Sequence, residues 1–137
     1  TGLEMMERSI ATILHQDFTT LKKDMTNETS IKKMLEDEVT EAYILAEENK
    51  FLGKVTLQNL LVANAKDKLL SSLQKDPITI KSDASLQQAM EVAVRFVGES
   101  IPVIDRKSNS LLGVVTEADL FRDYLDLQNK IVDLERR

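Results

Sequence analysis

The segment Gly113-Val114-Val115-Thr116-Glu117-Ala118-Asp119 has a diverged copy sixty positions earlier in the chain, Gly53-Lys54-Val55-Thr56-Leu57-Gln58-Asn59. Each copy follows a short apolar run and a polar turn, and each opens a segment in which apolar residues recur at helical spacing. A repeat of this length is one unit of supersecondary structure, so its presence decides how the rest of the chain is interpreted. The sequence therefore predicts two similar halves.

The repetition extends upstream of both copies. Residues 100–113 are predicted to form a strand, a turn and a second strand, and residues 40–53 have the same length and punctuation. Residues 85–90 and residues 30–35 each begin a helical pattern with serine, and residues 76–80 correspond to residues 17–21. Each half is predicted to run strand, helix, strand, strand, helix, which makes the fold class α/β (α+β).

Local signals place the ends of the predicted helices. Ser30 is a candidate cap for a helix that begins at Ile31, after a polar connection at residues 22–28. Residues 57–65 are expected to form a helix that continues towards residue 70. Ser85 and Gln88 have the spacing of a capping box. The helix that they open is expected to reach Val97 and to be longer than its counterpart in the first half.

The order of these motifs resembles that of the CBS domain, named after cystathionine β-synthase. Two such repeats in tandem resemble a CBS pair, or Bateman module, and the resemblance covers residues 17–124. It implies two β-α-β-β-α repeats in a pseudo-twofold arrangement, sheet against sheet, with flanking N- and C-terminal helices. The residues that carry it are Asp76-Pro77-Ile78-Thr79-Ile80, Ser85-Leu86-Gln87-Gln88-Ala89-Met90, Ser100-Ile101-Pro102-Val103-Ile104-Asp105 and Leu111-Leu112-Gly113-Val114-Val115-Thr116-Glu117-Ala118-Asp119-Leu120.

Four segments follow from this assignment. Residues 1–16 are predicted to be an N-terminal linker helix, residues 17–75 the first repeat, residues 76–124 the second repeat and residues 125–137 a C-terminal helical extension. The last helix carries a seam of apolar residues with alternating steps of four and three, as in a coiled coil. The seam is expected to pack onto the first helix or onto a second subunit, and exposed apolar surface of this kind predicts a homodimer. The seam consists of Leu120, Tyr124, Leu127, Ile131 and Leu134.

Composition excludes several classes of function. Of the 137 residues, 42% are hydrophobic and 30% charged, as in an ordinary soluble globular chain, and the absence of cysteine excludes disulfides and thiolate metal sites. The net charge of -5 argues against nucleic acid as a partner. No apolar run approaches the roughly 20 residues that span a bilayer. Only four glycines are present and none forms a phosphate-binding loop, so we expect no enzyme, no catalytic residue and no required cofactor.

Two polar features are interpreted as structural. His15 is the only histidine and lacks the partners of a zinc site, so it is interpreted as an ordinary residue at a helix end. The acidic residues at 36–38 and Glu41 are interpreted as a solvated loop and not as a magnesium site, because nothing in the sequence organises their geometry. No metal site is predicted.

The pair Thr116 and Asp119 has two interpretations. By spacing alone, Thr116 caps the last helix and Asp119 hydrogen-bonds back to it, as in a capping box. The same geometry suits a ligand, since a helix N-terminus attracts phosphate and a carboxylate one turn inside can accept hydrogen bonds from ribose hydroxyls. The spacing itself leaves both interpretations open and favours the first.

The resemblance to CBS domains adds a ligand. It implies that AMP, ADP or ATP binds beside Thr116, which would contact phosphate, and Asp119, which would hold the ribose. Adenine would lie against the strands around Ile78, Thr79, Ile101, Pro102 and Val103. In the first half, Thr56 and Asn59 match the same pattern. Asn59 lacks the carboxylate charge that strengthens such hydrogen bonds, and Ala42 and Leu45 also depart from the pattern, so a weak or empty second site is expected there.

The predicted function is a regulatory, adenosine-nucleotide-sensing CBS pair. Residues 96–102 and 116–121, followed by a trailing helix, resemble the cytoplasmic tail of bacterial ClC-type chloride channels and transporters. This implies a cytoplasmic domain of an inner (plasma) membrane protein, with the membrane-embedded transport domain of the same chain as its partner. A chain that begins at Thr1 instead of Met fits a fragment. The alternatives are a structural dimerisation module without ligand, or the regulatory domain of another transporter or enzyme.

Overall fold

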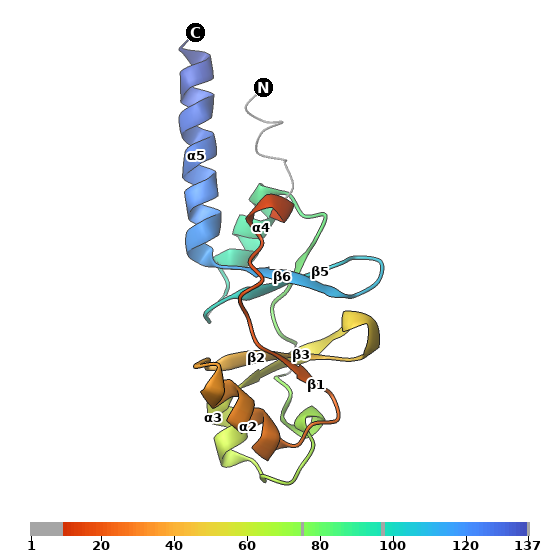
Figure 1. Ribbon diagram of the computed structural model, residues 1–137. Coiled ribbons are helices and arrows are strands. Elements are labelled where there is room, and N and C mark those ends of the chain that lie inside the picture. Colours follow the sequence, from red (N-terminus) through yellow and green to blue (C-terminus); the bar gives the residue numbers. More distant parts are fainter. Residues whose placement is uncertain (1–9, 75, 97, 137) are drawn as a thin grey trace. The chain divides into compact units, whose positions relative to one another are not determined.

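The computed structural model describes residues 10–74, 76–96 and 98–136, which form two compact units (Figure 1). The first-repeat unit consists of residues 17–77 and 108–111, and the second-repeat unit consists of residues 78–107 and 112–137 with the N-terminal residues up to 16. Each unit holds one three-stranded sheet. Most of the predicted N-terminal helix lies outside the described residues, and residues 10–13 form a single turn of 3-10 helix.

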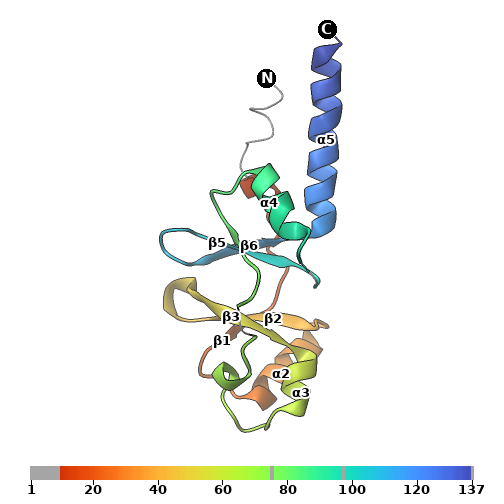
Figure 2. The same cartoon turned by 180° about the vertical axis from the view of Figure 1, so that it is seen from behind.

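The first-repeat unit follows the predicted order of elements. Strand β1 (Thr20–Lys22), helix α2 (Asn27–Glu36), strand β2 (Glu41–Leu45), strand β3 (Phe51–Thr56) and helix α3 (Leu57–Val62) succeed one another. Strand β1 pairs with β2 in parallel, which requires the crossover through α2, and β2 pairs with β3 antiparallel. Both helices lie on one face of this sheet, as Figure 2 shows from the opposite side.

The second-repeat unit repeats this order. It contains strand β4 (Ile80–Lys81), helix α4 (Leu86–Ala93), strand β5 (Ile101–Ile104), strand β6 (Leu111–Val115) and helix α5 (Glu117–Glu135). The sheet order is β4-β5-β6, with β4 and β5 parallel. The predicted α/β class and the two repeats of strand, helix, strand, strand, helix are confirmed.

In each unit, a short segment from elsewhere in the chain pairs antiparallel with the last strand of the sheet. His15 pairs antiparallel with Val114 of β6, through backbone hydrogen bonds of 2.8 and 3.0 Å. In the first-repeat unit, the backbone N–H of Gln74 donates to the carbonyl of Lys54 in β3 over 2.8 Å. His15 and Gln74 are 59 positions apart, which is close to the repeat length, so the pairing is itself repeated.

The two glycines of the repeated motif allow this close approach. A Cβ atom at Gly113 would lie 3.0 Å from the backbone oxygen of His15, and one at Gly53 would lie 2.7 Å from a methyl carbon of Leu73. Glycine within a strand often marks a place where another chain segment comes this near. At Gly113 the absence of a Cβ leaves room for the His15 backbone, whereas at Gly53 the nearest atom belongs to the flexible end of the Leu73 side chain.

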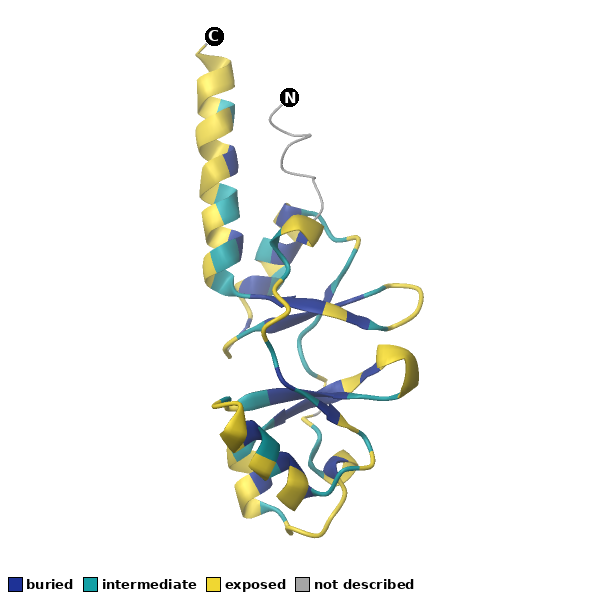
Figure 3. Cartoon of the chain, in the orientation of Figure 1, coloured by how far each residue is buried: buried dark blue, intermediate teal, exposed yellow. Residues whose placement is uncertain are grey.

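Each unit has its own hydrophobic core (Figure 3). In the second-repeat unit, Leu120 and Leu127 of α5 are fully buried in the same cluster as Ile10, whereas Leu134 is half exposed. Part of the predicted seam thus packs inside its own unit, against the N-terminal segment, which is one of the two expected arrangements. The homodimer stays a prediction, but Leu127 cannot contribute to a dimer interface, because its side chain is buried within its own unit.

Three predicted helix boundaries are wrong. Helix α2 is capped by Thr26, whose hydroxyl accepts from the Thr29 backbone N–H, and Ser30 is buried inside the helix with its hydroxyl bonded to the Thr26 carbonyl. Helix α3 ends at Val62 and α4 at Ala93. Consequently α4, with 8 residues, is shorter than its counterpart α2, with 10. The capping box of Ser85 and Gln88 is confirmed.

The second core can be tested at Ile101, whose side chain is fully buried. Ile101→Ala is expected to lower the free energy of unfolding by about 2–5 kcal/mol, since it removes buried methylenes and leaves a cavity. Leu112→Ala, in the next strand, is the matched control: Leu112 is 39% exposed, and its loss should cost less than about 1 kcal/mol. Urea unfolding measures both, and equal losses would contradict the assigned core.

Candidate functional site

The N-terminus of helix α5 organises the candidate site. Thr116 has an extended backbone, with φ of -105° and ψ of 157°, and so ends strand β6 and caps the helix. Its hydroxyl oxygen accepts a hydrogen bond from the Asp119 backbone N–H at 3.1 Å. The predicted cap is confirmed, and it places the Asp119 side chain within the first turn of a 19-residue helix.

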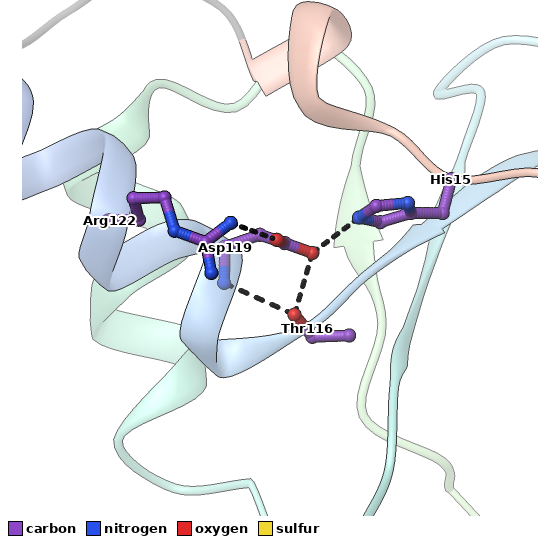
Figure 4. Close-up of polar contacts among 4 residues, drawn as sticks. All are labelled: His15, Thr116, Asp119 and Arg122. Atoms are coloured by element: carbon purple, nitrogen blue, oxygen red, sulfur yellow. Dashed lines mark hydrogen bonds and ion pairs between the residues drawn. The ribbon is translucent and has the colours of Figure 1, made fainter.

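Asp119 contacts three other side chains (Figure 4). Its Oδ2 accepts from the Thr116 hydroxyl at 2.7 Å and lies 2.5 Å from His15 Nε2. Its Oδ1 lies 3.4 Å from a terminal guanidinium nitrogen of Arg122, one helical turn further on. The Asp119 side chain is 17% exposed, while those of His15 and Arg122 are 50% and 73% exposed. The largely buried Asp119 carboxylate thus accepts one hydrogen bond from the capping residue of its own helix and contacts two exposed side chains.

These contacts keep Asp119 ionised. The hydrogen bond from the Thr116 hydroxyl lowers the pKa of the Asp119 carboxyl, and His15 and Arg122 lower it further, while partial burial opposes the shift. The net direction is downward, so Asp119 carries its negative charge at neutral pH. An ionised carboxylate is the form that accepts strong hydrogen bonds from ligand hydroxyls.

A pocket of about 280 Å³ adjoins this carboxylate. Its walls come from the N-terminal segment on one side and from helix α5 on the other. They include one guanidinium and one imidazole, but also three carboxylates. The lining residues are Thr12, Ile13, Leu14, His15, Asp119, Arg122, Asp123 and Asp126.

The residues predicted to hold adenine do not line this pocket. Ile101, Pro102 and Val103 are buried in strand β5, and Ile78 and Thr79 are half-buried ahead of strand β4. Thr116 and Asp119 are the predicted site residues that the structure brings into contact. The adenine contacts stay a prediction.

The first-repeat unit has a pocket of about 400 Å³ beside the start of helix α3, but its lining residues are not the repeat counterparts of those around Asp119. Thr56 caps α3 and accepts from the Asn59 backbone N–H at 3.2 Å, as Thr116 does in α5. The Asn59 side chain, however, is exposed and is not part of the lining. The pocket is lined by Thr40, Glu41, Thr56, Leu57, Gln58 and Leu61.

Sequence reasoning missed two members of the site. Arg122 is three residues after Asp119, so helical spacing could have placed it beside the carboxylate. His15 lies 104 positions before Asp119, and only the backbone pairing with Val114 brings it there. The expected position at a helix end is wrong, because His15 follows the 3-10 turn and pairs with Val114, whereas its interpretation as a structural residue stays a prediction.

The described residues offer neither a metal site nor a membrane span. No group of three or more His, Asp or Glu side chains among residues 10–74, 76–96 and 98–136 could hold a metal ion. Within the same residues, no helix combines the length and the apolar character needed to cross a membrane.

Comparison with known proteins identifies the fold. Residues 70–126 match the family model described as CBS domain. A CBS domain pair/ACT domain protein from Thermotoga maritima has a TM-score of 0.74 and 17% identity, covering 87% of this chain and 98% of that one. The cytosolic domain of the Mg2+ channel MgtE in complex with ATP has a TM-score of 0.74 and 16% identity, covering 85% of this chain and 48% of that one.

A curated relative shows the same region inside a longer protein. A homoserine O-acetyltransferase of Methanohalobium evestigatum is 26% identical over 115 residues, which is 82% of this chain but 23% of the relative. The chain therefore spans about a quarter of the length of that relative. The resemblance to a CBS pair is confirmed as a fold, while the resemblance to a ClC tail stays a prediction.

The ionisation of Asp119 predicts a pH-dependent contribution to stability. Because its pKa is lowered on folding, the contribution is fully present above the unfolded value of about 3.9 and is lost as pH falls through the folded value. Asp119→Asn should therefore lower the free energy of unfolding by about 1 kcal/mol near neutral pH and by progressively less below about pH 4. Urea unfolding between pH 7 and 3 measures this, with exposed Asp126→Asn as control. A difference that is independent of pH would contradict the assignment.

Proposed function

We propose that this CBS domain pair is a regulatory module that senses an adenosine nucleotide, AMP, ADP or ATP, beside Asp119. The observation that carries the proposal is the ionised Asp119 carboxylate, held by Thr116 at the wall of the 280 Å³ pocket. A carboxylate can accept hydrogen bonds from both hydroxyls of a ribose. The solved ATP complex of a protein with the same fold supports this choice of ligand.

The groups around Asp119 define how a nucleotide would enter. Arg122 and His15 are exposed and hold Asp119 by surface contacts, which are worth little because water competes for them. Ribose hydroxyls can therefore replace Arg122 and His15 as partners of Asp119, while the hydrogen bond from the Thr116 hydroxyl to Asp119 is kept. Arg122, once released, and the positive end of the α5 dipole are then available to a phosphate.

The acidic residues of the pocket limit how much phosphate it accepts. Asp123 and Asp126 line it together with Asp119, against one arginine and one histidine. Each additional phosphate adds negative charge inside the pocket and is repelled by these carboxylates. Salt screens this repulsion only in part, because the charges lie closer together than a Debye length of about 8 Å. We therefore propose that AMP binds more tightly than ATP when no divalent cation is present.

A structural dimerisation module without ligand is the second candidate. It is supported by the fact that both oxygens of the Asp119 carboxylate already have partners within the protein, which gives this side chain a structural role without a ligand. In this case Thr116 and Asp119 stabilise the helix and nothing more.

The host protein is a further part of the proposal. The resemblance of residues 96–121 to ClC tails supports a chloride channel or transporter, with this region on the cytoplasmic face of the inner membrane. The Mg2+ channel named above supports an ion-transport host without supporting chloride, and the acetyltransferase supports an enzyme as host. A nucleotide that displaces His15 from Asp119 would weaken the attachment of the N-terminal segment. A change in that segment would then shift the conformational equilibrium of a membrane-embedded partner.

The nucleotide proposal is tested by calorimetry with AMP, ADP and ATP. Asp119→Ala is expected to weaken AMP binding roughly ten- to a hundredfold, the loss of charge-assisted hydrogen bonds of about 1.5–3 kcal/mol. Asn59→Ala, at the matching position of the first repeat, is the control and should leave the affinity unchanged. If none of the three nucleotides produces heat at millimolar concentration, the nucleotide proposal is contradicted. Thr116 and Asp119 would then serve only to cap helix α5.

The regulatory role is tested in the full-length host protein. If the host transports ions, flux in liposomes should change on addition of AMP for the wild type and not for Asp119→Ala, by the fivefold or more typical of a coupling of about 1–3 kcal/mol. Flux that ignores a nucleotide which demonstrably binds would exclude regulation and favour the dimerisation module.

A further inference from the structure

We propose that protonation of His15 controls access to the Asp119 carboxylate, so that the pocket beside helix α5 responds to pH as well as to its ligand. The protonated imidazole holds Asp119 against a ligand, whereas the neutral imidazole yields the carboxylate more readily to ribose hydroxyls. The inference concerns regulation of the site beside Asp119, and it rests on the proposed function for the ligand of that site. The pairing of the two side chains needs no ligand and can be measured separately.

The first observation is the contact between the two side chains. His15 Nε2 lies 2.5 Å from Asp119 Oδ2, the same oxygen that accepts from the Thr116 hydroxyl. An ionised carboxylate only accepts hydrogen bonds, so Nε2 is the donor. The contact is therefore a hydrogen bond when the ring is neutral and an ion pair when the ring is protonated. The ion pair is the stronger of the two, because both partners are then charged.

The second observation is that the backbone of His15 is held independently of its ring. The His15 N–H donates to the Val114 carbonyl at 2.8 Å, and the Val114 N–H donates to the His15 carbonyl at 3.0 Å. Beside it, Gln16 Nε2 donates to the Leu112 carbonyl at 2.8 Å. These three bonds bring the ring to Asp119 without involving it. The His15 side chain is 50% exposed, so the ring can turn towards solvent while the pairing with β6 is kept.

The third observation is that His15 has no rival as the group that titrates near neutral pH. Histidine is the side chain that ordinarily changes charge between about pH 5 and pH 8, and perturbed cysteine thiols also titrate there. The chain contains one histidine and no cysteine. Among side chains, a change in the pocket over this range is therefore expected to come from His15.

The other charged groups around the ring keep their charge over the same range. The 3-10 turn Ile10–Ile13 and strand β6 contain no ionisable side chain. Helix α5 supplies the ionisable side chains that line the pocket with His15, and aspartate and arginine ordinarily titrate well outside this range. These side chains are Asp119, Arg122, Asp123 and Asp126.

The direction of the pH effect follows from competition. At low pH a ligand that takes Asp119 must displace an ion pair, and at high pH it must displace only a hydrogen bond from the neutral ring. Affinity for a ligand that binds through its ribose hydroxyls is therefore expected to rise with pH. The rise is limited to about fivefold, because a half-exposed ion pair contributes little in water.

The experiment uses adenosine as the probe, because a phosphate group itself titrates near pH 6 and would add its own pH dependence. Calorimetry between about pH 5 and pH 8 is expected to show an affinity of the wild type for adenosine that rises up to about fivefold with pH. His15→Gln should remove this dependence, since its amide can donate a hydrogen bond but carries no charge. Arg122→Gln is the matched control: it removes the other exposed partner of Asp119, and its affinity should still rise with pH.

A measurement without ligand separates the pairing from nucleotide sensing. A double-mutant cycle of His15→Ala and Asp119→Ala, read by urea unfolding, should give a larger coupling between the two side chains near pH 5 than near pH 8. Equal coupling at both pH values overturns the inference. A wild-type affinity for adenosine that ignores pH, or a pH dependence that persists in His15→Gln, also overturns it. Failure of adenosine and AMP to bind the wild type at any pH overturns the proposed nucleotide sensing, whereas the cycle would still report the His15–Asp119 pairing.

Discussion

The close approach of the His15 backbone to Gly113 is the constraint on which the second-repeat unit depends. A Cβ atom at position 113 would lie 3.0 Å from the His15 carbonyl oxygen, so any residue other than glycine would push the N-terminal segment away from β6. That pairing places the His15 imidazole against Asp119 and forms one wall of the 280 Å³ pocket. At Gly53 the nearest atom is instead a methyl carbon of the Leu73 side chain, which is flexible. The space left by Gly113 thus contributes to the position of the candidate site.

Local signals in the sequence predicted the fold well. The strands at residues 101–104 and 111–115 and the caps at Ser85 and Thr116 are local patterns, and all four agree with the structure. The start of α2 was misplaced because Thr26 and Ser30 are both good caps, and only tertiary packing, which buries Ser30, decides between them. The site was less predictable, since His15 reaches Asp119 through a contact between segments 104 residues apart.

Glu41 illustrates a different limit. In the sequence it follows the acidic residues 36–38 and was grouped with them as solvated loop. Its actual partner, Lys54, is in the neighbouring strand of the hairpin, where alternation alone would place apolar residues. A charge at a core position breaks the local pattern, and such breaks tend to mark functional sites. Comparison of the two repeats was the available signal, because Ile101 and Val114 are what the fold requires at these positions when no charge is needed.

The two repeats therefore place their carboxylates on different elements of the same scaffold. Asp119 belongs to a helix and is held by a hydroxyl, with the exposed side chains of His15 and Arg122 as further partners. Glu41 belongs to a strand and is paired with the buried Lys54. If a nucleotide binds Asp119 as proposed, its binding would be linked to the N-terminal segment, since His15 would have to release Asp119. A half-exposed contact of this kind is worth up to about 1 kcal/mol, or roughly a fivefold change in affinity. That lies at the lower end of allosteric couplings, and by reciprocity anything that pulls the N-terminal segment away from α5 would raise nucleotide affinity by the same factor. In the proposed regulatory role, the signal would therefore pass from Asp119 through His15 to the N-terminal segment.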